Sequence, residues 1–337
     1  MPAPDSSQPE LVAEIRAEIA RAGGRITFAR FMDLALYHPR FGYYTGGVAR
    51  IGKHGDFFTS VSVGPLFGKI LAQFFCKLRA ESGALDFAVW EFGGRGGELR
   101  ADVLAVAPEL TWNIVEAREP RPTKMTGCVF SNELLDALPV HRVQVRGGAW
   151  QELYVAAVVE GFVEEAGALS DPRLMAALAD LPVTQMEGYR TEINLCALDW
   201  LEQIAARLRQ GWVLTFDYGF ERGDYYAPHR RDGHVQCYFR HARHSDPFCN
   251  IGAQDITAHV DFSALVEHGR TLGLEPIRFC EQGKFLREEG ADVIRAIVEH
   301  DAGQYSKERN AIRQLLHPAH MGHMFRALLQ QQRAERI

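Results

Sequence analysis

The sequence predicts an α/β protein built on a doubly wound, Rossmann-like sheet that is mostly parallel. Predicted strands and helices alternate through the middle of the chain, which is the pattern of parallel strands joined by crossover helices. A glycine-rich turn follows the first of these strands. Only eleven residues separate Glu116 from Cys128, too few for a helix, a further strand and a second helix. One edge of the sheet is therefore expected to be trimmed.

Residues 1–84 are expected to form an N-terminal helical segment with a long loop rich in glycine and aromatic residues. Apolar residues at four-residue spacing predict an amphipathic helix over 10–21. A second helix is expected over 27–36, with Thr27 as its N-cap. The loop over 37–60 shows no clear period, and a helix over 65–80 follows it.

Residues 85–225 are expected to carry the core sheet, with an inserted hairpin in the region 140–190. The hairpin prediction comes from residues 142–161, where apolar and polar side chains alternate on both sides of a Gly-Gly pair. The other elements expected in this part are strands at 87–92, 112–117, 128–133 and 212–219 and helices at 97–107 and 192–209. Residues 226–337 are expected to face a substrate and complete the sheet, with a helix at 261–272, a strand at 275–281 and two C-terminal helices.

The composition excludes several classes of protein. The chain has 337 residues and a net charge of -6, so no basic field favours nucleic acid. No uncharged apolar run approaches the length of a membrane span. The first residues resemble neither a secretory signal nor an arginine-rich presequence. Six scattered cysteines form no CxxC pair, and together these features predict a cytoplasmic protein with reduced cysteines.

The sequence FGGRGGEL, residues 92–99, predicts a turn whose backbone can come close to a ligand. A strand, a glycine turn and a helix N-terminus form a concave site at the carboxyl edge of a parallel sheet. Glu116 lies nineteen residues after Gly97, where a carboxylate binds the ribose hydroxyls of a nucleoside cofactor. The cofactor-binding residues predicted here are Glu91, Gly93, Gly94, Gly97 and Glu116. The alternative is a tight turn without a ligand.

The charges around this turn favour S-adenosyl-L-methionine over a dinucleotide. The template GxGxxG fits in no register, because Arg95 and Leu99 occupy positions that need glycine. Glu91 and Glu98 flank the turn and would repel a pyrophosphate. S-adenosyl-L-methionine carries a sulfonium and an ammonium and no phosphate. A nicotinamide dehydrogenase is the alternative enzyme class.

Several stretches resemble the MidA-like family of S-adenosylmethionine-dependent methyltransferases. They are YHPRFGYYT, GDFFTS followed by PLFG, EFGGRGGEL, SNELLDALPV, FDYGFERGDYYAPHR and DITAHVDF, in the family's order over residues 37–262. The resemblance implies a class I methyltransferase core. It also implies protein arginine as a substrate class, which is known for mitochondrial members that help to assemble respiratory complex I.

Three departures from the family pattern lead to an alternative. Arg95 replaces the middle glycine of the turn, Ser62 stands where relatives carry glutamate, and the segment after Glu116 is short. The chain would then be a binding or assembly factor that keeps the fold and has lost catalysis.

Polar residues after the predicted strands are the candidates for chemistry. The predicted catalytic residues are Glu133, Asp136 and Asp217, since carboxylates orient a cationic nitrogen nucleophile and localise its charge. Helix capping is the alternative role of Glu133 and Asp136. Asn132 is expected to bind the cofactor. So are Asp56, Thr59 and Ser60, whose alternative is an Asx-type surface turn.

No metal site is expected. Five histidines and two cysteines lie between residues 229 and 259, but their spacing matches no structural zinc pattern. The expected partner is a protein substrate, without nucleic acid or membrane. The sequence does not determine the oligomeric state or the acceptor.

Overall fold

Each of the two units of this chain draws on three separate stretches of sequence. The computed structural model describes residues 5–47, 60–94, 96–116, 119–179, 181, 183, 186–300, 306–317 and 321–333. The first unit is made of Met1–Phe57, Asp136–Ala197 and Glu221–Asp261. The second is made of Phe58–Leu135, Leu198–Phe220 and Phe262–Ile337. The sequence predicts three consecutive segments, residues 1–84, 85–225 and 226–337. The roles assigned to these segments stay predictions.

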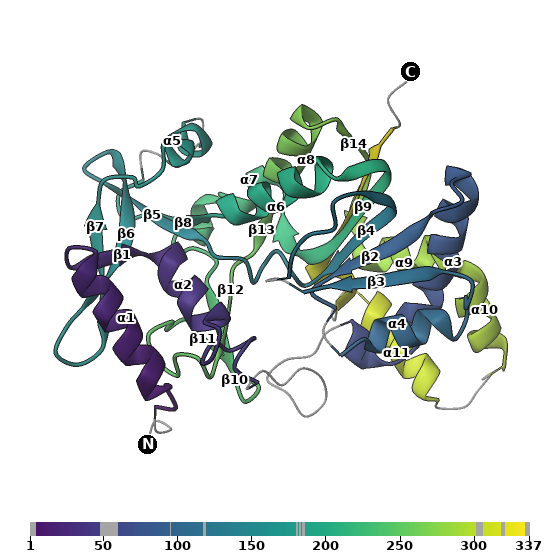
Figure 1. The fold of residues 1–337 in the computed structure, drawn as a ribbon, viewed down its shortest axis with the longest axis horizontal. Helices are drawn as coiled ribbons and strands as arrows, with labels where there is room; N and C mark the ends of the chain where they lie inside the picture. The colour runs from purple at the N-terminus through teal and green to yellow at the C-terminus, as the bar shows by residue number, and fades with distance from the viewer. Residues whose placement is uncertain are drawn as a thin grey trace. The chain divides into compact units, whose positions relative to one another are not determined.

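The second unit is built on the predicted α/β sheet. Its strands follow the order β14, β15, β9, β4, β2, β3, and Figure 1 shows β3, β2, β4 and β9 side by side. These four strands are parallel to one another, while β15 is antiparallel to both of its neighbours. The bounds are β2 Ala88–Phe92, β3 Thr111–Val115, β4 Met125–Asn132, β9 Leu208–Phe220, β14 Leu274–Glu281 and β15 Phe325–Gln332. Because β3 ends this order, the prediction of a trimmed edge is confirmed.

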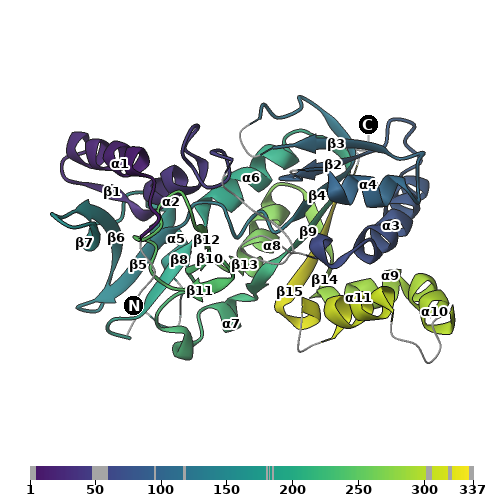
Figure 2. The same ribbon diagram turned by 90° about the horizontal axis from the view of Figure 1, so that it is seen from below.

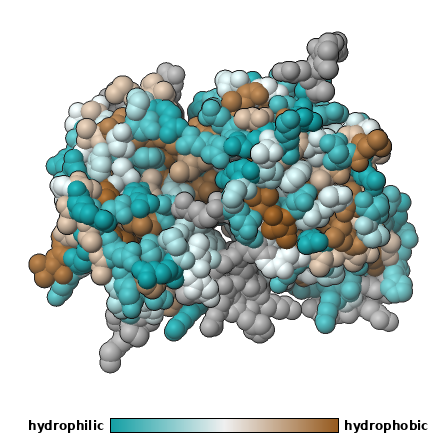
Figure 3. All heavy atoms as spheres, viewed as in Figure 1, coloured by the Kyte–Doolittle hydropathy of each residue, from teal (hydrophilic) through white to brown (hydrophobic). Residues whose placement is uncertain are grey.

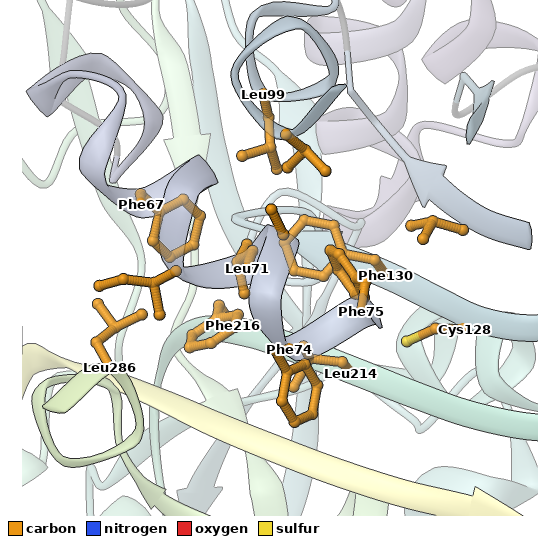
Figure 4. Close-up of a cluster of buried hydrophobic side chains, with 14 of the residues drawn as sticks. Phe67, Leu71, Phe74, Phe75, Leu99, Cys128, Phe130, Leu214, Phe216 and Leu286 are labelled. Carbon is orange, nitrogen blue, oxygen red and sulfur yellow. The ribbon is translucent and has the colours of Figure 1, made fainter. Parts of the chain in front are cut away.

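Helices cover both faces of this sheet because side chains alternate between the two faces along each strand. On one face, buried side chains of β2, β4 and β9 pack against α3, α4, α9 and α11 (Figures 2 and 4). On the other face, Phe92 of β2 meets Trp200 of α6 in an edge-on ring contact. The helices of this unit are η1 Val61–Val63, α3 Leu66–Ser82, α4 Glu98–Leu104, α8 Phe262–Thr271, α9 Gln282–Glu289, α10 Ala291–His300 and α11 Lys307–Leu316, while α6 Leu195–Ala205 continues from the first unit.

The first unit contains the predicted hairpin. Strands β5 and β6 pair antiparallel and turn at Gly147 and Gly148, which both have positive φ. They belong to a sheet of order β1, β6, β5, β8, with β7 also paired to β6, and a smaller sheet has the order β11, β10, β12. The elements of this unit are α1 Pro9–Arg21, β1 Arg25–Thr27, α2 Phe28–Tyr37, β5 His141–Arg146, β6 Ala149–Ala157, β7 Phe162–Gly167, α5 Pro172–Leu178, β8 Arg190–Ile193, α7 Arg222–Tyr225, η2 Pro228–Arg230, β10 Gln236–Phe239, β11 Ala242–His244, β12 Asp255–Thr257 and β13 Val260–Asp261.

The N-terminal helices follow the sequence prediction closely. Leu11, Ile15 and Ile19 form the buried stripe of α1. The side chain of Thr27 caps α2 by accepting a hydrogen bond from the backbone N–H of Arg30 at 3.1 Å. Local spacing and capping chemistry were sufficient here because both signals act within one or two helical turns.

Two predictions of secondary structure are wrong, and long-range strand pairing explains both. The helix expected over 192–209 is instead the end of β8, the shorter α6 and the start of β9, where Leu208 pairs with Met125. The end of the chain holds three described helices and the strand β15, where two helices were expected. The sequence FRALLQQQ favours a helix by propensity, but β14 and β9 both offer it backbone partners.

On the face drawn in Figure 3, hydrophobic patches are small and separated by hydrophilic residues. Across the residues that the structure describes, no helix is both long enough and apolar enough to cross a bilayer.

Candidate active site

The glycine turn between β2 and α4 has the geometry that only glycine accepts easily. Gly93 has φ of 75° and Gly97 has φ of 72°, in the left-handed region. A Cβ atom on Gly94 would lie 2.5 Å from the carboxyl carbon of Glu91. The turn therefore exposes backbone directly above a buried acid. Arg95 lies outside the described residues.

Glu91 is a buried carboxyl group beneath this turn. Its side chain accepts a hydrogen bond from Trp112 Nε1 at 2.8 Å, and the residue is only 4% exposed. Burial raises the pKa of Glu91 to about 7, the charge of Glu116 adds to the rise, and the bond from Trp112 opposes it. The carboxyl edge of β2 thus carries a group that changes charge near neutral pH.

The raised pKa of Glu91 predicts a pH-dependent stability. In the unfolded chain this carboxyl titrates near 4.5, and in the folded chain near 7. Between these values the folded state holds a proton that the unfolded state releases, so the free energy of unfolding falls as the pH rises. The loss reaches about 3 kcal/mol above pH 7, from the shift in pKa.

Urea unfolding of wild type and Glu91→Gln at pH 5 and pH 8 measures this effect. The glutamine keeps an acceptor for Trp112 and cannot titrate. Wild type should lose more stability than the variant between the two pH values. An equal loss in both proteins would contradict the assignment.

The end of β4 places Asn132 and Glu133 beside Ser60. One oxygen of Glu133, Oε1, accepts hydrogen bonds from Asn132 Nδ2 at 2.9 Å and from the backbone N–H of Ser60 at 3.2 Å. Glu133 has φ of 53°, which strains a residue with a side chain. No helix begins in the described residues directly after Glu133, so helix capping does not account for this carboxylate.

Asp217 anchors the turn that follows Glu133. It is fully buried on β9, and its two oxygens accept hydrogen bonds from the backbone N–H groups of Leu135 and Tyr218, each at 2.8 Å. The backbone N–H of Glu133 also donates to the carbonyl of Phe216 at 2.9 Å. Through these contacts Asp217 holds the turn that carries Glu133. Its predicted catalytic role is untested.

The remaining predicted residues fall into separate groups. Asp136 is buried and belongs to the first unit, where its backbone carbonyl accepts a hydrogen bond from Ala258 at 2.9 Å. Glu116 follows β3, and its backbone N–H donates to Glu119 Oε2 at 3.1 Å. Asp56 and Thr59 lie outside the described residues. The second unit thus brings Ser60, Asn132 and Glu133 into one cluster.

Gln282 is a member of this cluster that sequence reasoning missed. It is fully buried at the start of α9, and its Oε1 accepts a hydrogen bond from Ser60 Oγ at 3.1 Å. Since β14 runs parallel to β4, both strands end at the same edge of the sheet. One sequence signal could have revealed Gln282. It is a polar residue that directly follows a strand ending at this edge of the sheet.

The residues at this edge fit a cationic nucleoside cofactor. Glu116 supplies negative charge beside a turn whose glycines carry no side chains, and Glu91 adds to it when it loses its proton near neutral pH. Among the described residues, Asn132 Oδ1 is buried and has no hydrogen-bond partner, so a ligand donor such as an ammonium group would complete it.

The histidine cluster does not form a metal site among the residues described. His234 Nδ1 lies 3.3 Å from His259 Nδ1, and His234 Nε2 lies 2.9 Å from the carbonyl of Tyr225. Burial lowers the pKa of His259 to about 3, and His234 adds to the effect. In this part of the chain, no group of three or more potential ligands gathers.

Comparisons with known proteins identify the family. The model of a family described as "Putative S-adenosyl-L-methionine-dependent methyltransferase" matches residues 106–280. A protein from Burkholderia thailandensis, described as a "likely methyl transferase" and solved with S-adenosyl-homocysteine bound, is 32% identical with a TM-score of 0.90, covering 99% of this chain and 96% of that one. A native structure from the same organism is 31% identical with a TM-score of 0.87, covering 99% and 95%.

Curated relatives are more distant in sequence. The protein arginine methyltransferase NDUFAF7, mitochondrial, of Rattus norvegicus is 26% identical over 93% of this chain and 83% of its own length. The NDUFAF7 homolog of Drosophila melanogaster is 26% identical over 96% and 85%. These mitochondrial relatives contradict the prediction of a cytoplasmic protein, which rested on the first residues and on the scattered cysteines. The described cysteines are all free, which does not distinguish the two compartments.

The family match, the bound S-adenosyl-homocysteine of the related structure and the shared fold agree with the resemblance read from the sequence. This chain belongs to the family of S-adenosyl-L-methionine-dependent methyltransferases.

Proposed function

We propose that this methyltransferase modifies an arginine side chain of a protein, and that Glu133 binds the guanidinium group. The observation that carries the proposal is the fixed carboxylate of Glu133 at the carboxyl end of β4. Asn132 Nδ2 and the backbone N–H of Ser60 both donate to its Oε1. The names of the relatives as protein arginine methyltransferases support the same acceptor.

The cofactor site of the proposal is the edge beside Glu133. The backbone of Gly93, Gly94 and Gly97 would approach the cofactor, and Glu116 would bind its ribose hydroxyls. Glu91 and Asn132 would face its cationic groups. Ser60, which is fixed beside Glu133, is proposed to bind the cofactor as well. When bound, S-adenosyl-L-methionine supplies an electrophilic methyl group on a sulfonium.

The proposed role of Glu133 is to orient the guanidinium group and to accept its proton. A guanidinium group stays protonated at neutral pH and offers only hydrogen-bond donors. A carboxylate that accepts two of these bonds fixes the plane of the group and localises its positive charge. A guanidinium nitrogen that gains a methyl group must give up one proton, and Glu133 would be placed to accept it. Asp217 is proposed to support this carboxylate through the turn that holds it.

Two variants separate cofactor binding from methyl transfer. Glu116→Ala should weaken the binding of S-adenosylhomocysteine in calorimetry by about 10–100-fold, the usual effect of losing charged hydrogen bonds. Glu133→Gln should bind it normally and lose about 10²–10⁴-fold in kcat, the usual contribution of a general base. The transfer assay uses tritiated S-adenosyl-L-methionine and an acetylated arginine peptide.

The controls are an otherwise identical lysine peptide and the variant Glu165→Gln. Glu165 is exposed in the first unit and pairs with Arg25 at 2.8 Å. Its substitution should change neither measurement. Binding of S-adenosylhomocysteine without transfer to the arginine peptide would contradict the acceptor. Equal transfer to the lysine peptide would contradict its specificity.

A further inference from the structure

Gln282 carries a buried amide group that is only half satisfied. The residue is 0% exposed, and its Oε1 accepts a hydrogen bond from Ser60 Oγ at 3.1 Å. Its Nε2 is buried and has no hydrogen-bond partner among the residues that the structure describes. If the amide were turned around, Nε2 would meet Ser60 and Oε1 would lack a partner. One end of the amide is unpaired in either orientation.

An unpaired amide end is costly in a folded protein. Burying a polar group without a partner costs about 1–3 kcal/mol, and most such groups in native proteins are paired. A methionine of nearly the same size would fill the space after β14 without this cost. The arrangement is explained if a ligand supplies the missing partner.

Ser60 connects this amide to the proposed acceptor site. Its side chain donates to Gln282, and its backbone N–H donates to Glu133 Oε1 at 3.2 Å. Both contacts lie within the second unit. Gln282 and Glu133 are linked through Ser60 by two hydrogen bonds. The distance between the amide of Gln282 and the carboxylate of Glu133 is therefore at most on the order of 10 Å. A single peptide residue can span this distance with its backbone and side chain.

The chemistry of the two groups is complementary to one amino-acid residue. Glu133 is an acceptor and suits a cationic side chain, which offers donors only. In the orientation in which Oε1 accepts from Ser60 Oγ, the free end of the Gln282 amide is its N–H, a donor that cannot bind a guanidinium group. It needs an oxygen atom, and the nearest oxygen that a protein substrate offers is a backbone carbonyl.

We propose that Gln282 is a positioning residue for the methyl acceptor, and that its amide donates a hydrogen bond to a backbone carbonyl of the peptide whose side chain Glu133 binds. The inference rests on the proposed function and adds the recognition of the peptide backbone. It follows that Gln282 matters for a peptide and not for an isolated guanidine.

The test measures methyl transfer by the full chain to two acceptors. One is the acetylated arginine peptide, and the other is propylguanidine, which has no carbonyl group. Gln282→Met should raise the KM for the peptide about tenfold more than it raises the KM for propylguanidine. Gln282→Leu also removes the donor and introduces no ionisable group, so it should raise the peptide KM in the same way and serves if the methionine variant does not fold.

The matched control is Gln330→Met on β15. Gln330 is 1% exposed, and its Nε2 donates to the carbonyl of Leu265 at 3.5 Å. This variant should lower the Tm more than Gln282→Met and leave the peptide KM unchanged. An unchanged peptide KM in both Gln282 variants, or an equal rise for propylguanidine, would overturn the inference alone. A wild type that methylates neither acceptor would overturn the proposed function, and the inference with it.

Discussion

Gly127→Ala is expected to destabilise the methyltransferase sheet so strongly that the second unit does not fold. Gly127 lies in β4, between β2 and β9, with φ of 119°. A Cβ atom would lie 2.1 Å from the carbonyl oxygen and 2.7 Å from the nitrogen of Ala88. These are backbone atoms of the neighbouring strand, so they cannot move aside without breaking the sheet. We expect a loss on the order of 4 kcal/mol or more, in the range of severe single substitutions.

Gly211 on β9 lies beside Gly127, on the side of β4 opposite to β2. It pairs with Gly127, and its own Cβ would lie 1.8 Å from the carbonyl oxygen of Gly127. Three backbones thus come unusually close at one level of the sheet. Gly211→Ala should therefore be as damaging as Gly127→Ala, because it disrupts the same contact.

Urea unfolding and circular dichroism measure these effects, with Gly147→Ala as the control. Gly147 also has positive φ, at 60°, but nothing lies within 4 Å of its Cβ position. Its substitution should cost only about 1–2 kcal/mol, the usual penalty for a left-handed residue with a side chain. A Gly127→Ala protein as stable as the Gly147→Ala protein would show that backbone crowding is not the cause.

Asp217→Asn is expected to displace the turn after β4 and to reduce methyl transfer at least a hundredfold. Both oxygens of the buried carboxylate accept backbone N–H groups, from Leu135 and Tyr218. Asparagine places an NH₂ group against one of these donors, so one buried N–H loses its acceptor. Hydrogen bonds to a charged group are worth about 1.5–3 kcal/mol each, and we expect a loss of about 3 kcal/mol. Glu133, two residues before Leu135, then leaves its fixed position.

The measurements for Asp217→Asn are the Tm and the transfer of a tritiated methyl group to the arginine peptide. Asp171→Asn is the control, since that side chain caps α5 near the surface of the first unit. It should lose at most about 1 kcal/mol, as for an ordinary helix cap, and keep full activity. If Asp217→Asn is stable but inactive, Asp217 acts directly in the reaction. If it is stable and active, the supporting role is wrong.

The sequence by itself determined the elements that depend on neighbouring residues. Patterns within a few residues predicted four local features. These are the buried stripe of α1, the N-cap of α2, the Gly-Gly turn between β5 and β6, and the glycine turn after β2. The short connection after Glu116 also predicted the trimmed edge, because chain length limits what can be inserted. The quoted motifs identified the family and its cofactor.

Only the tertiary structure decided where distant stretches meet. The propensity of FRALLQQQ favours a helix, and it became β15 because β14 and β9 lie on either side of it. The same holds for the cluster around Glu133, which needs residues 60, 133 and 282 to come together across more than two hundred positions of sequence. Hydrogen bonds between residues that are far apart in the chain leave no periodic signal in the sequence, so Gln282 and the supporting position of Asp217 became visible only once the sheet had brought the ends of its strands to one edge.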